Sequence, residues 1–351
     1  MADANGVDRR EVWRAGREGA LLFDVSSRGR LTLAGPSRQS FLHRTTTNDI
    51  KALQPGQGAA SLLVTQKGRI IDRLLVLAMA DHLLVITSDG GHETTTDVLS
   101  RYIVFEDVQV ADRTAETFQF ALCGPRASEV LAGCGTTGAR LFHHEPADLG
   151  GRSVTVATEV GPAGPAFLII GAAADRKTVR NSLMTRGAPA GLVECTVATF
   201  EPLRVAAGLP AHGRELSEQW NPLEARQEDA LSFDKGCYVG QEVIARLRTY
   251  DKVKRRLTCL DVEGATPLAA DTVVRAATVE GIITSAAPVP GEPRTVALAV
   301  IGGDLATGTE VSIGAADTPR ADRVAGAPAT ARDVRQAPPE PVVPAGKRFR
   351  S

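Results

Sequence analysis

Residues 234–242 read Asp-Lys-Gly-Cys-Tyr-Val-Gly-Gln-Glu, and this segment is the most distinctive stretch of the chain. It places a cation, a thiol, a phenol, two glycines, an amide and a carboxylate within nine residues. The glycines let the backbone approach a ligand or a partner closely. Lys235 beside Cys237 would favour the nucleophilic thiolate. The alternative is a structural turn that carries an inert, buried cysteine.

The composition of the 351 residues is that of a globular protein with two or three domains, because 43% are apolar and 23% are charged. Lys and Arg number 40 against 41 for Asp and Glu, so the whole chain has no field that attracts nucleic acid or anionic lipid. Any anion site must therefore be local. We expect no direct, stable nucleic-acid binding and no membrane association.

The start of the chain, residues 1–14, has three acidic residues and no apolar run, so it resembles neither a secretory signal nor a transit peptide. Long apolar stretches such as residues 74–80 are far shorter than the roughly 20 residues of a membrane-spanning helix. These features predict a cytoplasmic protein.

The cysteine pattern argues against a stable metal site. Cysteines occupy positions 123, 134, 195, 237 and 259, an odd count without a CxxC pair, and the histidines lack the spacing of metal ligands. We therefore expect reduced thiols and assign no metal ligands.

Outward from residues 234–242 toward the N-terminus, the sequence predicts a mixture of helices and strands. Residues 199–207 form a predicted helix that Gly208 ends. Three strands separated by turn residues are predicted to form an antiparallel meander: 59–64, 70–79 and 82–87. Residues 21–25 and 31–33 flank a glycine turn and are predicted to pair as a β-hairpin. This part of the chain is therefore expected to be α+β.

Toward the C-terminus the pattern changes to short Val-, Ile- and Thr-rich segments between glycine and proline turns. These segments are 272–274, 281–284, 296–300 and 310–313. They predict a small antiparallel β-barrel. From about residue 318 large apolar residues are almost absent, which predicts a disordered tail.

The segment Lys235–Glu242 matches the signature KGCYxGQE, and on it the chain resembles the YgfZ family, a branch of the glycine-cleavage T-protein superfamily. The resemblance extends over roughly residues 20–315. It includes Asp24-Val25-Ser26, Thr47-Asn48-Asp49-Ile50, Lys67-Gly68-Arg69, Arg204 to Gly208 and Pro222-Leu223-Glu224-Ala225.

The resemblance implies a cloverleaf of ferredoxin-like α+β domains around a folate pocket, with a C-terminal antiparallel β-barrel. The domains expected on this basis are an N-terminal folate-binding domain, a second α+β domain that holds the signature, the barrel and the tail: 15–115, 116–250, 251–317 and 318–351. It also implies tetrahydrofolate or a derivative as cofactor.

The family further implies an accessory role in the assembly or maintenance of iron–sulfur enzymes, some of which modify tRNA. The expected partners are reduced folate and iron–sulfur client or assembly proteins.

Three departures from the T-protein pattern leave the enzymatic activity open. The stretch Gly68-Arg69-Ile70-Ile71-Asp72-Arg73 has arginine where T-proteins carry the second of two aspartates. The family's Arg-x-Glu-Ala-Gly appears here as Arg204-Val205-Ala206-Ala207-Gly208, and no match to the GYTGEDG stretch is found. The alternatives are an aminomethyltransferase of the T-protein type, and a non-catalytic scaffold whose folate pocket has decayed.

Folate has a flat pterin with donor and acceptor edges and an anionic glutamate tail, so its site requires a carboxylate or amide at one end and arginines at the other. Asn48, Asp49 and Asp72 are candidates for the pterin, and Arg69, Arg73 and Arg204 for the tail, although each arginine could equally be a solvated surface charge. The signature adds its own candidates: Tyr238, Gln241 and Glu242 for the cofactor, and Cys237 with Lys235 for catalysis.

Overall fold

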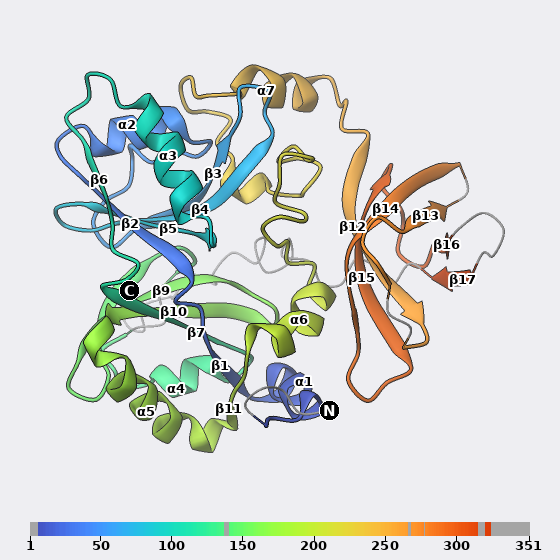
Figure 1. Cartoon of the computed structure of the whole chain (residues 1–351), viewed down its shortest axis with the longest axis horizontal. Coiled ribbons are helices and arrows are strands. Elements are labelled where there is room, and N and C mark those ends of the chain that lie inside the picture. Colours follow the sequence, from blue (N-terminus) through green and yellow to red (C-terminus); the bar gives the residue numbers. More distant parts are fainter. Residues whose placement is uncertain (1–5, 137–139, 266–267, 277, 315–319, 324–351) are drawn as a thin grey trace, which may run out of the picture.

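The computed structural model of the protein describes residues 6–136, 140–265, 268–276, 278–314 and 320–323. Two α+β units lie one above the other, and a barrel stands beside them (Figure 1). The helices are α1 (Arg9–Glu18), α2 (Arg38–Thr45), α3 (His92–Tyr102), α4 (Ala127–Leu131), α5 (Arg176–Gly187), α6 (Val197–Ala206) and α7 (Gln241–Thr249).

The first sheet is antiparallel and has five strands. In spatial order they are β3 (Gly58–Val64), β4 (Ile70–Ala78), β5 (Leu83–Asp89), β2 (Arg28–Ala34) and β6 (Gln109–Asp112). The predicted meander is confirmed as β3, β4 and β5. Phe41 and Leu42 of α2 and Leu99 of α3 share a buried cluster with residues of this sheet, so these two helices cover one of its faces.

The second sheet has six strands. In spatial order they are β11 (Leu192–Glu194), β1 (Ala20–Asp24), β7 (Thr117–Cys123), β10 (Gly164–Ala172), β9 (Ser153–Gly161) and β8 (His144–Asp148). The pairing of β1 with β11 is parallel, and β1 pairs with β7 in the antiparallel sense. Val130 of α4 and Leu183 of α5 pack against one face of this sheet.

The predicted β-hairpin of residues 21–25 and 31–33 is wrong, because β1 and β2 belong to different sheets. The residues between them bond to other elements: the amide of Val25 donates to the carbonyl of Gln119, and that of Gly29 to Oγ1 of Thr87. The fully buried guanidinium of Arg30 binds Thr117 and nearby carbonyls. The polar groups of the residues between β1 and β2 are thus hydrogen-bonded to distant segments. The chain therefore passes from one sheet to the other here and forms no hairpin.

The C-terminal unit is a closed barrel, as predicted. Its strands are, in spatial order, β12 (Arg255–Glu263), β15 (Arg294–Gly302), β14 (Val279–Pro288), β13 (Val273–Ala276), β16 (Glu310–Ile313) and β17 (Arg320–Arg323). One residue pair, Asp261 with Arg323, joins β17 to β12. The predicted disordered tail therefore needs correction at β17, which pairs along β16. The rest of that tail, residues 318–319 and 324–351, lies outside the described residues.

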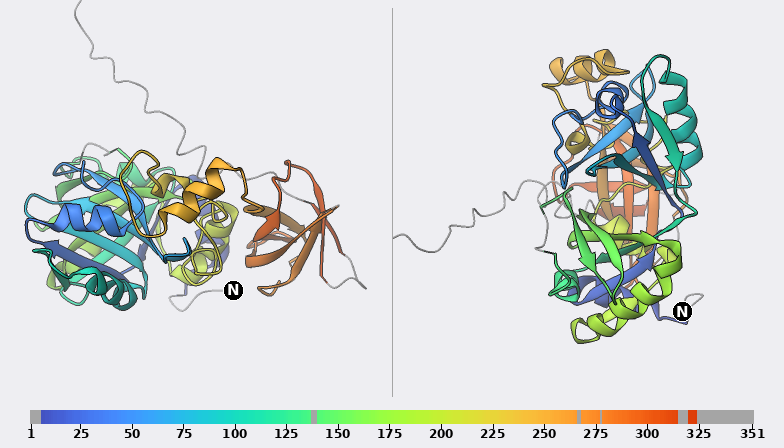
Figure 2. Two further views of the ribbon diagram at one scale, coloured as in Figure 1. Left: turned by 90° about the horizontal axis from the view of Figure 1, so that it is seen from above. Right: turned by 90° about the vertical axis from the view of Figure 1, so that its left-hand side faces the viewer.

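The free faces of the two sheets meet in one buried cluster, which also takes in α1, α6 and apolar residues of the barrel. The barrel lies to the side of the stacked α+β units, as Figure 2 shows in its left-hand view. The helix α6 begins with a capping box between Thr196 and Thr199, and Gly208 follows its end with a φ of 72°, so the predicted helix is confirmed.

The structure combines chain segments differently from the predicted division at residue 115. The strand β1 joins the second sheet, whereas Tyr238 and Ile244, from the signature segment and α7, share a buried cluster with Leu62 of β3 in the first sheet. No helix among the described residues is both long and apolar enough to cross a membrane.

Candidate functional site

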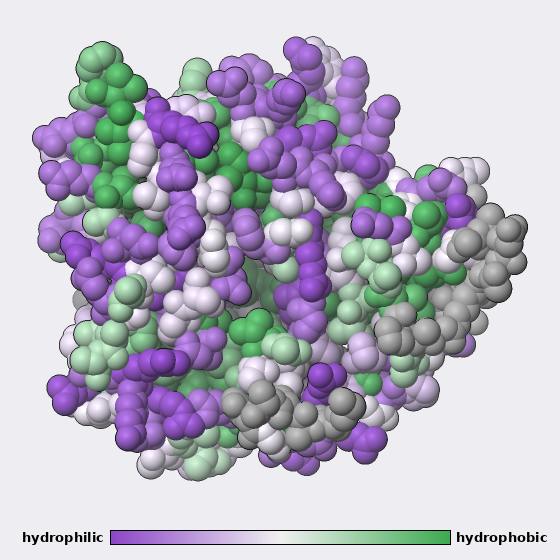
Figure 3. Space-filling view, viewed as in Figure 1, coloured by the Kyte–Doolittle hydropathy of each residue, from purple (hydrophilic) through white to green (hydrophobic). Residues whose placement is uncertain are grey.

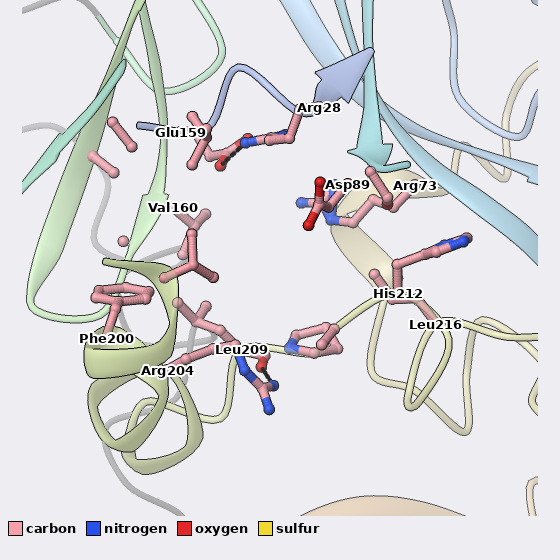
Figure 4. A pocket seen from close by; sticks show the side chains of 18 of the residues that line it. Arg28, Arg73, Asp89, Glu159, Val160, Phe200, Arg204, Leu209, His212 and Leu216 are labelled. Atoms are coloured by element: carbon pink, nitrogen blue, oxygen red, sulfur yellow. Dashed lines mark hydrogen bonds and ion pairs between the residues drawn. The ribbon is translucent and has the colours of Figure 1, made fainter. Parts of the chain in front are cut away.

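A cavity of about 480 Å³ lies between the free faces of the two sheets, and α6 with the loop after it forms the remaining wall (Figure 4). Phe23 of β1 and Phe200 of α6 both line it, with ring centroids 4.6 Å apart and planes inclined by 30°. The cavity therefore has an aromatic wall suited to a flat ring, and its size is within the usual range for small-molecule sites.

One side of the cavity carries a bidentate ion pair between Arg28 of β2 and Glu159 of β9, with N–O distances of 3.1 and 3.2 Å. Burial by itself raises the pKa of Glu159, but the charge and hydrogen bonds of Arg28 outweigh it and hold that pKa below its ordinary value. The carboxylate is therefore ionised, and the pair joins the two sheets at the cavity.

On the α6 side, Arg204 lies in a polar network. Its guanidinium donates to both carboxylate oxygens of Glu201 at 2.8 and 2.7 Å, to Oγ of Ser285 at 2.8 Å and to the carbonyl of Leu209. Glu215 is fully buried, accepts from Ser285 and lies 3.5 Å from Arg204. Because Ser285 belongs to β14, this network connects the wall of the cavity to the barrel.

A third polar group is formed by Asp72 and His212. The buried carboxylate of Asp72 accepts hydrogen bonds from the amides of Arg73 and Ser88 and from the hydroxyl of Thr95. His212 lines the cavity, and its Nδ1 is 3.7 Å from Asp72. Burial raises the pKa of Asp72, while the hydrogen bonds from Ser88 and Thr95 act in the opposite direction.

Of the candidates predicted for the cofactor tail, Arg204 and Arg73 line the cavity. Asp72, a candidate for the pterin, does not line it but lies 3.7 Å from the lining residue His212. Arg69 is bonded to the carbonyl of Gln219 and to Glu224, away from the lining residues. Arg73 also pairs with Asp229 at 2.9 Å.

Asn48 and Asp49 lie on the loop after α2 and not in the cavity wall. The amide nitrogen of Asn48 donates to the carbonyls of Ala60 and Asp229, and its oxygen accepts from the amide of Asp49. Asp49 pairs with His43 at 3.1 Å. The hydrogen-bonding groups of Asn48 are thus used to hold the loop.

The signature segment also lies away from the cavity. The ammonium of Lys235 donates to the carbonyls of His43, Thr46 and Asn48, and burial lowers its pKa to about 8. Lys235 therefore anchors the segment to the end of α2. The ring of Tyr238 is buried below that ammonium, 5.1 Å from it, and burial raises the pKa of the phenol to about 12.

The remaining signature residues surround the start of α7. Gly240 precedes the helix with a φ of 79°, Gln241 is its first residue and half-buried, and Glu242 is exposed in its first turn. Cys237 is the exposed cysteine of the chain, since the other four are buried. A Cβ built on the neighbouring Gly236 would meet no atom within 4 Å, so the backbone beside Cys237 is also open.

Sequence reasoning missed Arg28, Glu159, Phe200 and His212, all of which line the cavity. It also missed Gln119, which is fully buried and lies on the same face of β7 as the lining residues Ala121 and Cys123. Both polar atoms of its amide lack a hydrogen-bond partner in the structure. No local motif marks these residues, because strands from distant parts of the sequence bring them together.

The chain matches the family model described as the GCVT N-terminal domain over residues 4–235. It is 34% identical to the putative transferase At1g60990, chloroplastic, of Arabidopsis thaliana over 70% of this chain, although the match spans only 56% of the plant protein. It is 28% identical to an aminomethyltransferase of Symbiobacterium thermophilum over 86% of this chain and 84% of that protein.

Among solved structures, the glycine cleavage system aminomethyltransferase T from Bartonella henselae superposes with a TM-score of 0.78 at 21% identity. The superposition covers 93% of this chain and 90% of that one. This likeness confirms the predicted T-protein-type fold of α+β units with a C-terminal antiparallel barrel. Since the family model matches most of the chain, the protein belongs to the GCVT N-terminal domain family, within the T-protein superfamily.

Proposed function

We propose that the protein binds a reduced folate in the cavity between its sheets and acts, through the exposed thiol of Cys237, as an accessory protein for iron–sulfur enzymes of the kind the YgfZ signature implies. The observation that carries this proposal is the separation of the two sites. The one exposed cysteine lies on the outer surface, away from the residues that line the cavity.

The residues around the cavity fit a folate. The stacked rings of Phe23 and Phe200 offer a surface to a pterin. The buried, unpartnered amide of Gln119, on the same face of β7 as the lining residues Ala121 and Cys123, holds a donor and an acceptor behind that wall. Arg73 and His212 add groups that can attract a carboxylate at the opposite wall. When bound, tetrahydrofolate would supply one-carbon chemistry, and the residues of the chain would hold and orient it.

An exposed thiol on an open surface is suited to contact with another protein. One cysteine does not complete a four-ligand cluster site, so a role in cluster chemistry requires a partner that supplies the other ligands. The cavity then senses or stores folate, while Cys237 acts at the partner.

A Cys237→Ser variant tests this division of labour. We expect its melting temperature and its affinity for 5-formyltetrahydrofolate, measured by titration calorimetry, to equal those of the wild type. In a strain that lacks the gene it should fail to restore the activities of iron–sulfur enzymes, whereas Cys259→Ser, which changes a buried cysteine, should restore them if it folds. Full complementation by Cys237→Ser would reject the accessory role.

A second candidate is aminomethyl transfer to tetrahydrofolate, favoured by the similarity to a bacterial aminomethyltransferase along most of both chains. Against it, the carboxylate of Asp72 is buried and hydrogen-bonded, and Arg73 follows it in place of a second acid. Incubation with an aminomethyl-loaded lipoyl carrier protein and tetrahydrofolate decides between the two. Sustained formation of methylenetetrahydrofolate would establish the transferase.

A further inference from the structure

The surface over α7 and the segment that leads from it to β12 is strongly basic, although the whole chain is nearly neutral. Residues 246–256 hold six cations and one acid, Asp251. Hydrophilic side chains gather over this part of the molecule, at the top of Figure 3. The expectation that nucleic acid is not bound rested on the balance of charge in the whole chain. The cluster of cations in residues 246–256 makes the local charge positive in spite of that balance.

Several of these cations are available to a ligand. Arg246, Lys252 and Lys254 are exposed and have no ion pair with any described residue. Lys67 is also exposed and unpaired. It lies in the turn between β3 and β4, which packs against the first turn of α7 at Gly68. The face therefore extends from one end of α7 to the other.

The buried carboxylate of Glu224 does not neutralise the positive charge of this face. Glu224 binds Arg69 at 3.4 Å and Arg255 at 3.1 Å, so one carboxylate is shared by two guanidiniums. Glu242 and Asp251 are the exposed acids of α7 and of the segment after it. Arg256 is also paired, with Glu228 at 3.6 Å and Asp304 at 3.3 Å. The unpaired cations Arg246, Lys252, Lys254 and Lys67 still outnumber Glu242 and Asp251, and the face attracts a polyanion.

Aromatic groups are interleaved with the charges. The ring of Tyr250, directly after α7, is 66% exposed, and the ammonium of Lys252 lies 5.4 Å from it. The guanidinium of Arg248 lies 3.6 Å from the ring centroid of Phe233. An exposed aromatic ring among unpaired cations is the combination that binds unpaired bases and phosphates together. An acidic protein would use the cations and leave the tyrosine ring without a specific role.

We infer that this basic face, formed by α7, residues 250–255 and the turn at Lys67, binds single-stranded nucleic acid. The cations contact phosphates, and Tyr250 stacks on a base. This site is separate from the cavity and does not depend on folate binding.

The test uses the full chain and a fluorescein-labelled single-stranded RNA of about 16 nucleotides, followed by fluorescence anisotropy at several salt concentrations. The triple variant Arg246→Ala/Lys252→Ala/Lys254→Ala should reduce the slope of log affinity against log salt by about 2. Tyr250→Ala should weaken binding about tenfold at fixed salt and leave the slope unchanged. The matched control Arg9→Ala/Arg14→Ala/Lys177→Ala removes three exposed cations elsewhere and should change neither quantity.

Three results would overturn the inference. The control variant could lose as much affinity as the triple variant, which would mean diffuse attraction. A duplex with the same number of phosphates could bind as tightly as the single strand. Poly-L-glutamate could bind equally well while Tyr250→Ala has no effect, which would assign the face to an acidic protein. Melting temperatures of all variants, expected within the wild-type range, show that each is folded.

Discussion

The amide of Gln119 shows how a single buried side chain can report on a ligand. A buried donor and acceptor without partners lower the stability of the fold, so a ligand that pairs with them is the function we expect for this amide. Replacing Gln119 by Leu should weaken binding of 5-formyltetrahydrofolate about tenfold, equivalent to one lost hydrogen bond. The free energy of unfolding without ligand should stay equal or rise. Titration calorimetry and urea unfolding measure the two quantities, and unchanged affinity would remove Gln119 from the site.

Lys235 supplies a pH-dependent prediction at the same scale. Its folded-state pKa of about 8 is below the ordinary value of 10.5, so between these two values the unfolded chain binds the proton more strongly. The contribution of Lys235 to stability therefore rises as the pH increases through this window. The difference in free energy of unfolding between wild type and Lys235→Met should move in favour of the wild type between pH 7.5 and 9.5. A constant difference would contradict the lowered pKa.

At the scale of elements, the start of α7 depends on one backbone conformation. Gly240 has a φ of 79°, and a Cβ there would lie 2.5 Å from the carbonyl oxygen of Thr65. Gly240→Ala should therefore lower the free energy of unfolding by about 2 kcal/mol or more. Gly236→Ala, in the same signature, is the control and should have a small effect, since its Cβ meets nothing. Denaturant unfolding of both variants measures the contrast.

The sequence predicted those elements whose partners are local. The meander β3–β4–β5 and the barrel strands follow from short apolar segments and the turns between them. The hairpin at residues 21–33 failed because β1 takes its partners from residues 117–123 and 192–194. The signature could be recognised because it is a local motif. The anchoring of Lys235 beside α2 could not, since Lys235 bonds to carbonyls nearly 190 residues away in the chain.

At the scale of the whole molecule, Arg204 connects the cavity, α6 and the barrel. From sequence alone, Arg204→Ala is expected to weaken folate binding with little effect on stability. The structure changes the second part, because the substitution leaves Glu215 buried without its cation. We expect a loss of about 3 to 5 kcal/mol in the free energy of unfolding. Arg214→Ala, which removes an exposed partner of Glu201, should cost at most about 1 kcal/mol.

Because β1 leaves β2 and pairs with strands from later in the chain, its position has a consequence for how the protein folds during synthesis. The parallel pairing of β1 with β11 joins residues about 170 positions apart. At roughly 5 to 20 residues per second, a ribosome completes β11 about 10 to 30 s after β1 has been synthesised. During that interval the apolar residues of β1 lack their final neighbour on one edge, whereas the meander of the first sheet can already form. The nascent chain thus presents an unpaired strand that a chaperone can shield until translation reaches Glu194.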